Sequence, residues 1–244
     1  MSIADVDVLA AAGSRNGLGQ MVGLPVTDWQ PAGWPPRRSL SGRFCRLEPL
    51  DAASHGPALF AVMAADERNW TYLSYGPFAA YQDYQDWLAA QQARPDPHFY
   101  AIVDGATDLA VGVAAYLRID PAMGCIELGH LNFSPALQRR PAATEAMYLL
   151  MRQAFELGYR RYEWKCDALN LPSRQAAERL GFRFEGLFRQ AMVYKGRNRD
   201  TAWFSILDKE WPALRQGMER WLAPDNFDAA GRQLRTLAQC RGGD

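Results

Sequence analysis

The chain has 244 residues, 48% of them hydrophobic and 22% charged, which is enough for one large folded domain with or without extensions. Lysine plus arginine and aspartate plus glutamate each number 27, so the formal net charge is zero. This balance argues against a broad surface for nucleic acid or anionic membrane, and any anion site must be local.

Residues 1–39 mix glycine, proline and tryptophan without steady periodicity, and we predict an irregular arm packed on the domain. The opening residues, MSIADVDVLAAAGSRN, contain early acidic side chains and too short an apolar run for a signal peptide or a spanning helix. Four scattered cysteines, none in a CxxC pair, favour buried thiols in a reducing compartment, and the three histidines lack metal-ligand spacing. We therefore expect a cytoplasmic protein without a metal site, a nucleic-acid partner or a membrane partner.

Residues 40–209 show the periodicities of one α/β domain. Strands are predicted at 43–50, 99–103, 110–118, 126–133, 162–166, 182–188 and 201–207, and helices at 51–65, 81–93, 141–158 and 173–180. This order predicts a mixed sheet with helices on both faces. A further helix at 208–222 has apolar residues at helical spacing, which favours a packing face, and residues 210–244 form a predicted helical extension.

The segment LQRRPAATE, residues 137–145, joins the strand at 126–133 to the longest predicted helix. Pro141 suits a first helical turn. Free backbone N–H groups, the helix dipole and two guanidinium groups favour a phosphate or pyrophosphate there, and the alternative is that the two arginines are simply solvated. The polar side chains of this helix start are Gln138, Arg139, Arg140 and Thr144.

A second marker is a polar loop, Asn170 to Ser173, followed by a short helix that a glycine closes at Gly181. Taken together, the two markers resemble the GNAT superfamily of acyl-CoA-dependent N-acetyltransferases, and most closely the RimJ/RimL type that acetylates ribosomal-protein N-termini. The resemblance covers roughly Leu40 to Leu207. Its matches are Gln138, Pro141 and Ala143 on the family's Gln/Arg-x-x-Gly-x-Gly/Ala signature, Asn170, Ser173 and Gly181-Phe182 on its Asn…Ser…Gly-Phe segment, and Ile126 to His130 on its Glu-Ile-Gly-Tyr strand.

Two positions depart from the family pattern. Pro141 replaces the usual first glycine of the signature and removes one N–H donor from the phosphate cradle. Ala177 stands where many relatives carry the tyrosine that protonates the departing thiolate, whereas Ser173 matches the serine proposed for that task in the RimL type.

The resemblance implies an α/β (α+β) fold of the GNAT type, with a mostly antiparallel twisted sheet whose strands splay at the acetyl-CoA site. It also implies direct transfer of an acetyl group from acetyl-CoA to a primary amine of a peptide N-terminus or a small molecule. The alternatives are a non-catalytic acyl-CoA-binding protein and an enzyme that uses another acyl-CoA. The coenzyme-binding residues implied are Leu131, Asn132, Phe133, Gln138, Arg139, Arg140, Ala142, Ala143, Thr144, Asn170 and Ser173.

The attacking amine must lose a proton, and Glu127 is the first candidate for the base. The alternative for Glu127 is a structural carboxylate paired with an arginine such as Arg118. His130 is the competing base, or else a hydrogen-bonded core residue. A regular strand would place Glu127 and His130 on opposite faces, although a bulge at Gly129 would break that parity.

The acceptor-binding residues are predicted to be Trp70, Tyr72, Tyr75, Phe78 and Arg118. The aromatic residues among them lie between the first two helices, where the family places its acceptor wall, and the alternative is that they belong to the core. The arm and the C-terminal helix are candidates for association with a partner, which leaves a homodimer open.

Overall fold

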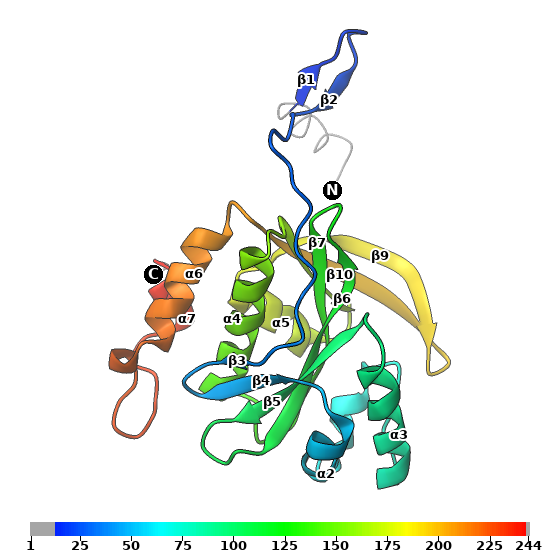
Figure 1. Cartoon of the computed structure of the whole chain (residues 1–244), viewed down its shortest axis with the longest axis vertical. Coiled ribbons are helices and arrows are strands. Elements are labelled where there is room, and N and C mark those ends of the chain that lie inside the picture. The colour runs from blue at the N-terminus through cyan, green and yellow to red at the C-terminus, as the bar shows by residue number, and fades with distance from the viewer. Residues whose placement is uncertain (1–12, 243–244) are drawn as a thin grey trace. The chain divides into compact units, whose positions relative to one another are not determined.

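The computed structural model describes residues 13–242, which fall into two compact units divided after Pro31 (Figure 1). The first unit contains a hairpin of β1 (Gly13–Arg15) and β2 (Met21–Gly23), which the sequence analysis did not predict. Asn16 closes the turn, because its side-chain oxygen accepts two backbone N–H groups. The first 12 residues of the predicted arm lie outside the described residues, and packing of the arm on the domain stays a prediction.

The second unit is built on an eight-stranded sheet with the order β3-β4-β5-β6-β7-β8-β10-β9. Neighbouring strands are antiparallel except β7 and β8, which are parallel. The predicted mixed, mostly antiparallel sheet is therefore confirmed. The strands are β3 (Leu40–Ser41), β4 (Cys45–Pro49), β5 (His98–Asp104), β6 (Ala110–Asp120), β7 (Cys125–Phe133), β8 (Arg161–Asp167), β9 (Arg183–Tyr194) and β10 (Arg197–Leu207).

Helices cover both faces of this sheet (Figure 1). Along β5 the side chains alternate between two apolar clusters: Tyr100 belongs to the cluster around α4, and Phe99 to the cluster around α2 and α3. One face carries α4 (Pro141–Glu156) and α5 (Leu171–Leu180), with α6 (Trp211–Leu222), η2 (Pro224–Asn226) and α7 (Leu237–Cys240) packed beside them, and the other carries α2 (Ala52–Met63), η1 (Glu67–Trp70) and α3 (Tyr81–Gln92).

Local capping sets where the helices begin. Asp51 caps α2 as predicted, because its Oδ1 accepts the N–H of Ser54 at 2.8 Å. Helix α4 begins at Pro141, also as predicted. Helix α5 begins two residues earlier than predicted, because Asn170 provides the cap and its Oδ1 accepts the N–H of Ser173 at 3.2 Å.

The hairpin of β9 and β10 is longer than the sequence predicted, since the strands run to Tyr194 and from Arg197. Both residues of its turn, Lys195 and Gly196, have positive φ values of +48° and +70°, which is the turn geometry that matches strand twist. Most of β9 is exposed, so this half of the hairpin has no buried alternation for a sequence pattern to reveal.

A buried carboxylate fastens the start of α4 to the turn before β4. Glu145 is only 4% exposed, and its two oxygens accept the N–H groups of Arg43, Phe44 and Cys45 at 2.7, 2.6 and 2.9 Å. The turn can approach this closely because Gly42 has no Cβ, which would overlap the Glu145 carboxylate. This contact fixes the helix whose first turn forms part of the candidate site.

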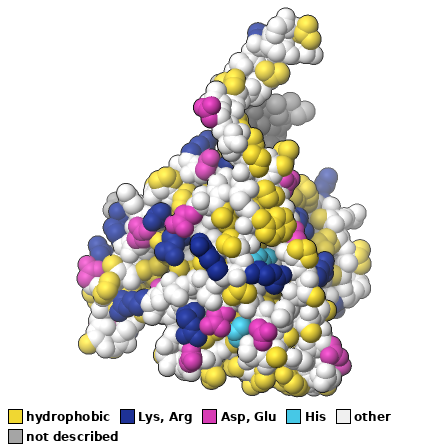
Figure 2. Space-filling view, in the orientation of Figure 1, with side chains coloured by type: hydrophobic (Ala, Val, Ile, Leu, Met, Phe, Trp, Pro, Cys, Tyr) yellow, Lys and Arg dark blue, Asp and Glu magenta, His cyan; other side chains and the backbone are white. Residues whose placement is uncertain are grey.

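On the face drawn in Figure 2, lysine and arginine side chains are interspersed with aspartate and glutamate. Within residues 13–242, no helix has the length and apolar character needed to cross a bilayer. The same residues contain no group of three or more histidine, cysteine, aspartate or glutamate side chains arranged to hold a metal ion.

Candidate active site

The two parallel strands of the sheet part at their carboxyl ends. Pairing of β7 with β8 ends at Leu128 and Trp164, although β7 continues to Phe133 and β8 to Asp167. Beyond this point the β7 edge that faces β8 has no ladder partner. Because α4 follows β7 and α5 follows β8, both helices begin at this same edge of the sheet, where open α/β sheets bind ligands. The predicted splay is confirmed.

The first turn of α4 has the features of an anion site. Its N-cap residue is Arg140, and no side chain forms a cap hydrogen bond. Arg139 and Arg140 are both exposed, and among the described residues neither forms an ion pair with a carboxylate. Uncapped N–H groups beside two unpaired guanidinium groups fit a pyrophosphate.

Two other predicted coenzyme residues already have partners. Gln138 donates from Nε2 to the Phe133 carbonyl at 2.7 Å and to Asn69 Oδ1 at 2.9 Å, so it closes the loop between β7 and α4. Thr144 is buried, and its hydroxyl oxygen accepts from Nη2 of Arg179 at 2.7 Å. The sequence analysis did not single out Arg179. The remaining residues of the set that line β7 and α4 are Leu131, Phe133 and Ala143, packed on the α4 cluster, and Ala142 and Asn132, which are buried.

Ser173 lies at the third position of α5, where its environment orients the hydroxyl. The indole Nε1 of Trp164 donates to Ser173 Oγ at 3.0 Å, and the serine N–H is satisfied by the Asn170 cap. Since Trp164 occupies an acceptor site of the oxygen, the hydroxyl hydrogen of Ser173 points away from the indole, and Cys166 is within its hydrogen-bonding reach. Trp164 belongs to the last residue pair before the splay, and no sequence pattern marks its contact with Ser173.

Glu127 belongs to a buried ion cluster on the α2 and α3 face. It is 3% exposed and accepts from Arg118 Nε at 2.7 Å and from Lys165 Nζ at 2.9 Å. Lys165 is 5% exposed, contacts Glu163 at 2.8 Å and lies 3.6 Å from the centre of the Trp203 ring. The ion pair with Arg118 is the contact that the structural alternative for Glu127 predicts.

A bulge in β7 changes the face on which His130 lies. Gly129 pairs with Ala115 and Asn132 with Val113, so β7 advances three residues while β6 advances two. His130, inside this bulge, has a φ of +50°. The regular alternation that would separate Glu127 from His130 is therefore broken.

His130 consequently points toward the α2 and α3 layer, the side that also holds Glu127. Its ring lies 4.9 Å from that of Phe99 and 5.7 Å from that of Tyr75, and its Nδ1 is 3.2 Å from the Tyr75 hydroxyl oxygen. Burial, with a smaller effect from Arg118, lowers the pKa of His130 to about 4. The imidazole is thus neutral at neutral pH.

Three of the predicted acceptor residues belong to an aromatic cluster. Trp70 is 4% exposed and packs edge-on against Tyr75 and Phe78, with ring centres 6.1 and 5.5 Å apart. Trp70 and Phe78 therefore fit the alternative that these aromatic residues belong to the core. Both also line a cavity of about 170 Å³ beside α2. Tyr72 differs, because its hydroxyl donates to the Leu169 carbonyl at 3.1 Å, in the loop between β8 and α5.

Residues 45–183, more than half of the chain, match the family model described as the acetyltransferase (GNAT) domain. The chain belongs to the GNAT acetyltransferase family. It is similar to a crystal structure of a GCN5-related N-acetyltransferase from Brucella melitensis, with 51% identity, a TM-score of 0.87, and coverage of 89% of this chain and 100% of that one. A GNAT-family structure from Chromobacterium violaceum ATCC 12472 is 48% identical, with a TM-score of 0.75 and coverage of 78% and 96%.

A curated relative, "Uncharacterized N-acetyltransferase p20" of Bacillus licheniformis, is 31% identical over 113 residues. The match spans 46% of this GNAT chain and 63% of that relative. The match places the chain in the GNAT acetyltransferase family and confirms the predicted superfamily. The names of these relatives do not give the RimJ/RimL branch or the acceptor.

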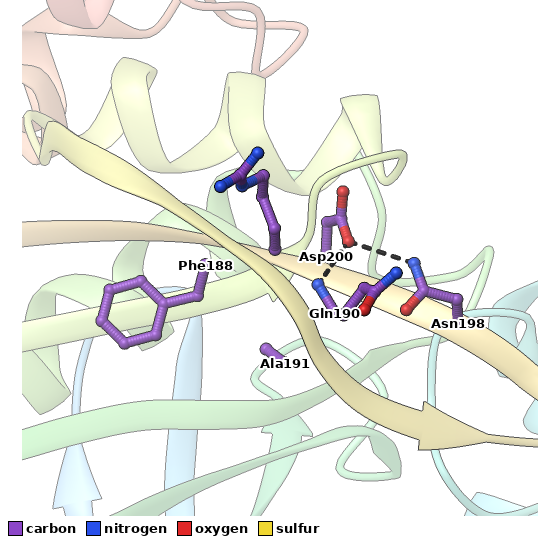
Figure 3. A pocket seen from close by; sticks show the side chains of 6 residues that line it. Phe188, Gln190, Ala191, Asn198 and Asp200 are labelled. Carbon is purple, nitrogen blue, oxygen red and sulfur yellow. Dashed lines mark hydrogen bonds between the residues drawn. The ribbon is translucent and has the colours of Figure 1, made fainter.

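A hollow of about 810 Å³ in this GNAT chain is lined by none of the predicted site residues (Figure 3). It is open, and it forms where the β9–β10 hairpin bulges at Asp200, whose Oδ1 accepts from Gln190 N at 2.7 Å and from Asn198 Nδ2 at 3.0 Å. Its lining residues are Phe188, Arg189, Gln190, Ala191, Asn198 and Asp200. No residue of the splay belongs to it.

Proposed function

We propose that this GNAT protein is an acetyl-CoA-dependent N-acetyltransferase of the RimJ/RimL type, which transfers the acetyl group directly to a primary amine of a peptide N-terminus or a small molecule. The observation that carries the proposal is the parting of β7 and β8 after Leu128 and Trp164. It leaves strand-edge hydrogen-bonding groups free directly in front of two helix N-termini.

Three parts of the chain would hold acetyl-CoA. The uncapped first turn of α4, with Arg139 and Arg140, binds the pyrophosphate. The free edge of β7 pairs with the amide groups of the pantetheine arm, as an added strand would. Backbone N–H groups between Leu131 and Phe133 polarise the acetyl carbonyl.

His130 accepts the proton of the attacking amine. It is neutral at neutral pH and lies on the face opposite α4 and α5, from which the acceptor approaches. When Nδ1 donates its hydrogen to the Tyr75 oxygen, Nε2 keeps a lone pair for the proton. Glu127 holds Arg118 and Lys165 in place at the edge of this site.

Ser173 donates its hydroxyl proton to the sulfur as the carbon–sulfur bond breaks, and solvent water returns a proton to the serine and takes up the one held by His130. The hydrogen bond from Trp164 supports this role, because it leaves the serine proton directed away from the indole. A serine acid also accounts for an alanine at position 177, where many relatives have a tyrosine.

The activity is tested by mixing the purified full chain with acetyl-CoA and a panel of amines and measuring free thiol. We expect thiol release that depends on the amine. Binding of acetyl-CoA without amine-dependent release would instead support a non-catalytic acyl-CoA-binding protein, and no uptake of CoA in calorimetry would refute the proposed coenzyme site.

The role of Ser173 is tested with Ser173→Ala, for which we expect kcat to fall by about 10²-fold or more while KM for acetyl-CoA changes little. The matched control is Trp164→Phe, which removes the indole donor but leaves the hydroxyl. We expect this control to lose less turnover than the alanine variant. Equal turnover of Ser173→Ala and the wild type would remove Ser173 from the mechanism.

A further inference from the structure

Asp167 is a nearly buried carboxylate at the open end of the splay. It is the last residue of β8, three positions beyond the final pair with β7, and is 5% exposed. Cys166 packs on the α4 and α5 side, so alternation along β8 directs Asp167 to the opposite face. Lys165, two residues earlier, shares that face and contacts Glu127.

The two oxygens of Asp167 have neutral donors only. Oδ1 accepts from the Leu169 N–H at 2.8 Å, and Oδ2 accepts from the Tyr194 hydroxyl at 2.8 Å. Within residues 13–242, no lysine, arginine or histidine nitrogen lies within 4.0 Å of this carboxylate. The other carboxylates of this face, buried Glu127 and half-buried Glu163, each have at least two cationic partners. Asp167 is the exception among them.

The tip of the β9–β10 hairpin brings Tyr194 to this position. Next to it, Lys195 donates from Nζ to the Trp70 carbonyl at 2.7 Å, which fixes the tip against η1. Burial and the neighbouring Asp167 raise the pKa of Tyr194 to about 12, so the phenol stays protonated and can donate to the carboxylate.

Tyr72 reaches the same corner from the segment after η1. Its hydroxyl donates to the carbonyl of Leu169, the residue whose N–H binds Asp167. Two tyrosines therefore lie near one carboxylate. The guanidinium of Arg199 already lies over the Tyr194 ring, 5.9 Å from its centre, so of these two rings Tyr72 is the one left for a ligand cation.

We infer that Asp167, together with Tyr194 and Tyr72, forms a subsite for a positively charged acceptor and binds the ammonium group of an amine as it docks. The inference rests on the proposed function and narrows its substrate class to amines that arrive as cations. A carboxylate retains lone pairs after accepting two hydrogen bonds, and an ammonium ion supplies both the missing charge and the donors. The ring of Tyr72 adds cation–π attraction.

The test measures binding directly, so it does not depend on turnover. The full chain is saturated with CoA, and its affinities for n-butylammonium and for its uncharged counterpart 1-butanol are compared by ligand-observed NMR at pH 7. We expect the cation to bind roughly tenfold or more tightly than the alcohol, because a hydrogen bond to a charged group is stronger than one between neutral groups. In Asp167→Asn, which keeps the side-chain shape and the acceptor for Leu169, we expect the two affinities to become equal.

Tyr194→Phe is the matched control, because it removes the hydrogen bond between the hairpin and Asp167 but keeps the carboxylate. We expect the preference for the cation to persist in this variant. No preference in the wild type, an unchanged preference in Asp167→Asn, or an equal loss in both variants would overturn the inference, the last by showing that Asp167 only secures the hairpin. A wild type that prefers the cation but releases no amine-dependent thiol would refute the proposed function and leave the subsite standing.

Discussion

Lowering the pH from 7.5 to 5 is expected to destabilise this protein through two histidines. His130 in the β7 bulge and His98 at the start of β5 are both held neutral, since burial lowers the pKa of each to about 4. His98 is 1% exposed, and its Nε2 has no hydrogen-bond partner among the described residues. In the unfolded chain both imidazoles return to a pKa of about 6.5.

The sign follows from proton binding. Between pH 6.5 and 4 the unfolded chain binds protons that the folded protein rejects, so the stability present above pH 6.5 is lost as the pH falls. With these pKa values, each histidine costs about 2 kcal/mol at pH 5, and the two together cost about 4 kcal/mol. Domains have unfolding free energies of about 5–15 kcal/mol, so this loss is large. Paired carboxylates with a lowered pKa, such as Glu163, lose their contribution to stability mainly below pH 5, outside the pH range of this experiment.

The measurement is urea unfolding followed by tryptophan fluorescence at several pH values from 7.5 to 5. His98→Phe, which lies outside the proposed catalytic groups, should abolish about half of the pH dependence. A loss below about 1 kcal/mol in the wild type would refute the reasoning. The same holds if NMR finds the His130 imidazole titrating near 6.5, because His130 would then contribute nothing to the loss of stability.

Two further perturbations test the buried charges. In the same urea titration, Glu145→Gln should lower the free energy of unfolding by about 3 kcal/mol, because an amide cannot accept all three backbone N–H groups. The control is Glu156→Gln, on the half-exposed side of the same helix, which should change the free energy of unfolding by less than about 0.5 kcal/mol. Equal effects of the two substitutions would contradict the role of the Glu145 carboxylate as the acceptor of the three N–H groups. Lys165→Met should cost about 3 kcal/mol against less than about 1 for the exposed Arg215→Met, and adding Glu127→Gln should restore part of the loss in calorimetric melting. No rescue would show that Lys165 and Glu127 are energetically independent.

Elements with a strong local signal could be predicted from the sequence. Helix α4 combines Pro141 at its first position with a long apolar face, and α5 combines the Asn170 loop with Gly181, whose φ of +103° suits only glycine well. The strand before α4 contains Ile126 and Phe133, and the strand before α5 contains Tyr162 and Trp164. Because these signals are local, they required no knowledge of tertiary contacts.

Contacts between distant segments could not be predicted in the same way. Lys165 meets Glu127 only because β7 and β8 pair in parallel at one register, and Tyr194 meets Asp167 only because a turn far along the chain reverses β9. A lysine in a strand is ordinarily an exposed residue, so its burial carries no sequence signal. The residue types at the site could be predicted from the sequence, whereas the residues that they contact could not.

Two bulges decide which side chains share the acceptor face. In β6, Arg118 has a φ of +48° beside a register shift, and in β7, His130 has a φ of +50° beside another. Each extra residue reverses the alternation of the strand, so His130 joins Glu127 on one face instead of lying behind it. Non-glycine residues adopt positive φ only at a cost, which the surrounding pairs of Arg118 with Glu127 and of His130 with Tyr75 offset. The residues that face the acceptor are therefore determined by backbone irregularities, which a periodic sequence pattern does not reveal. For this reason the residues could be predicted from the sequence, whereas the direction of their side chains could not.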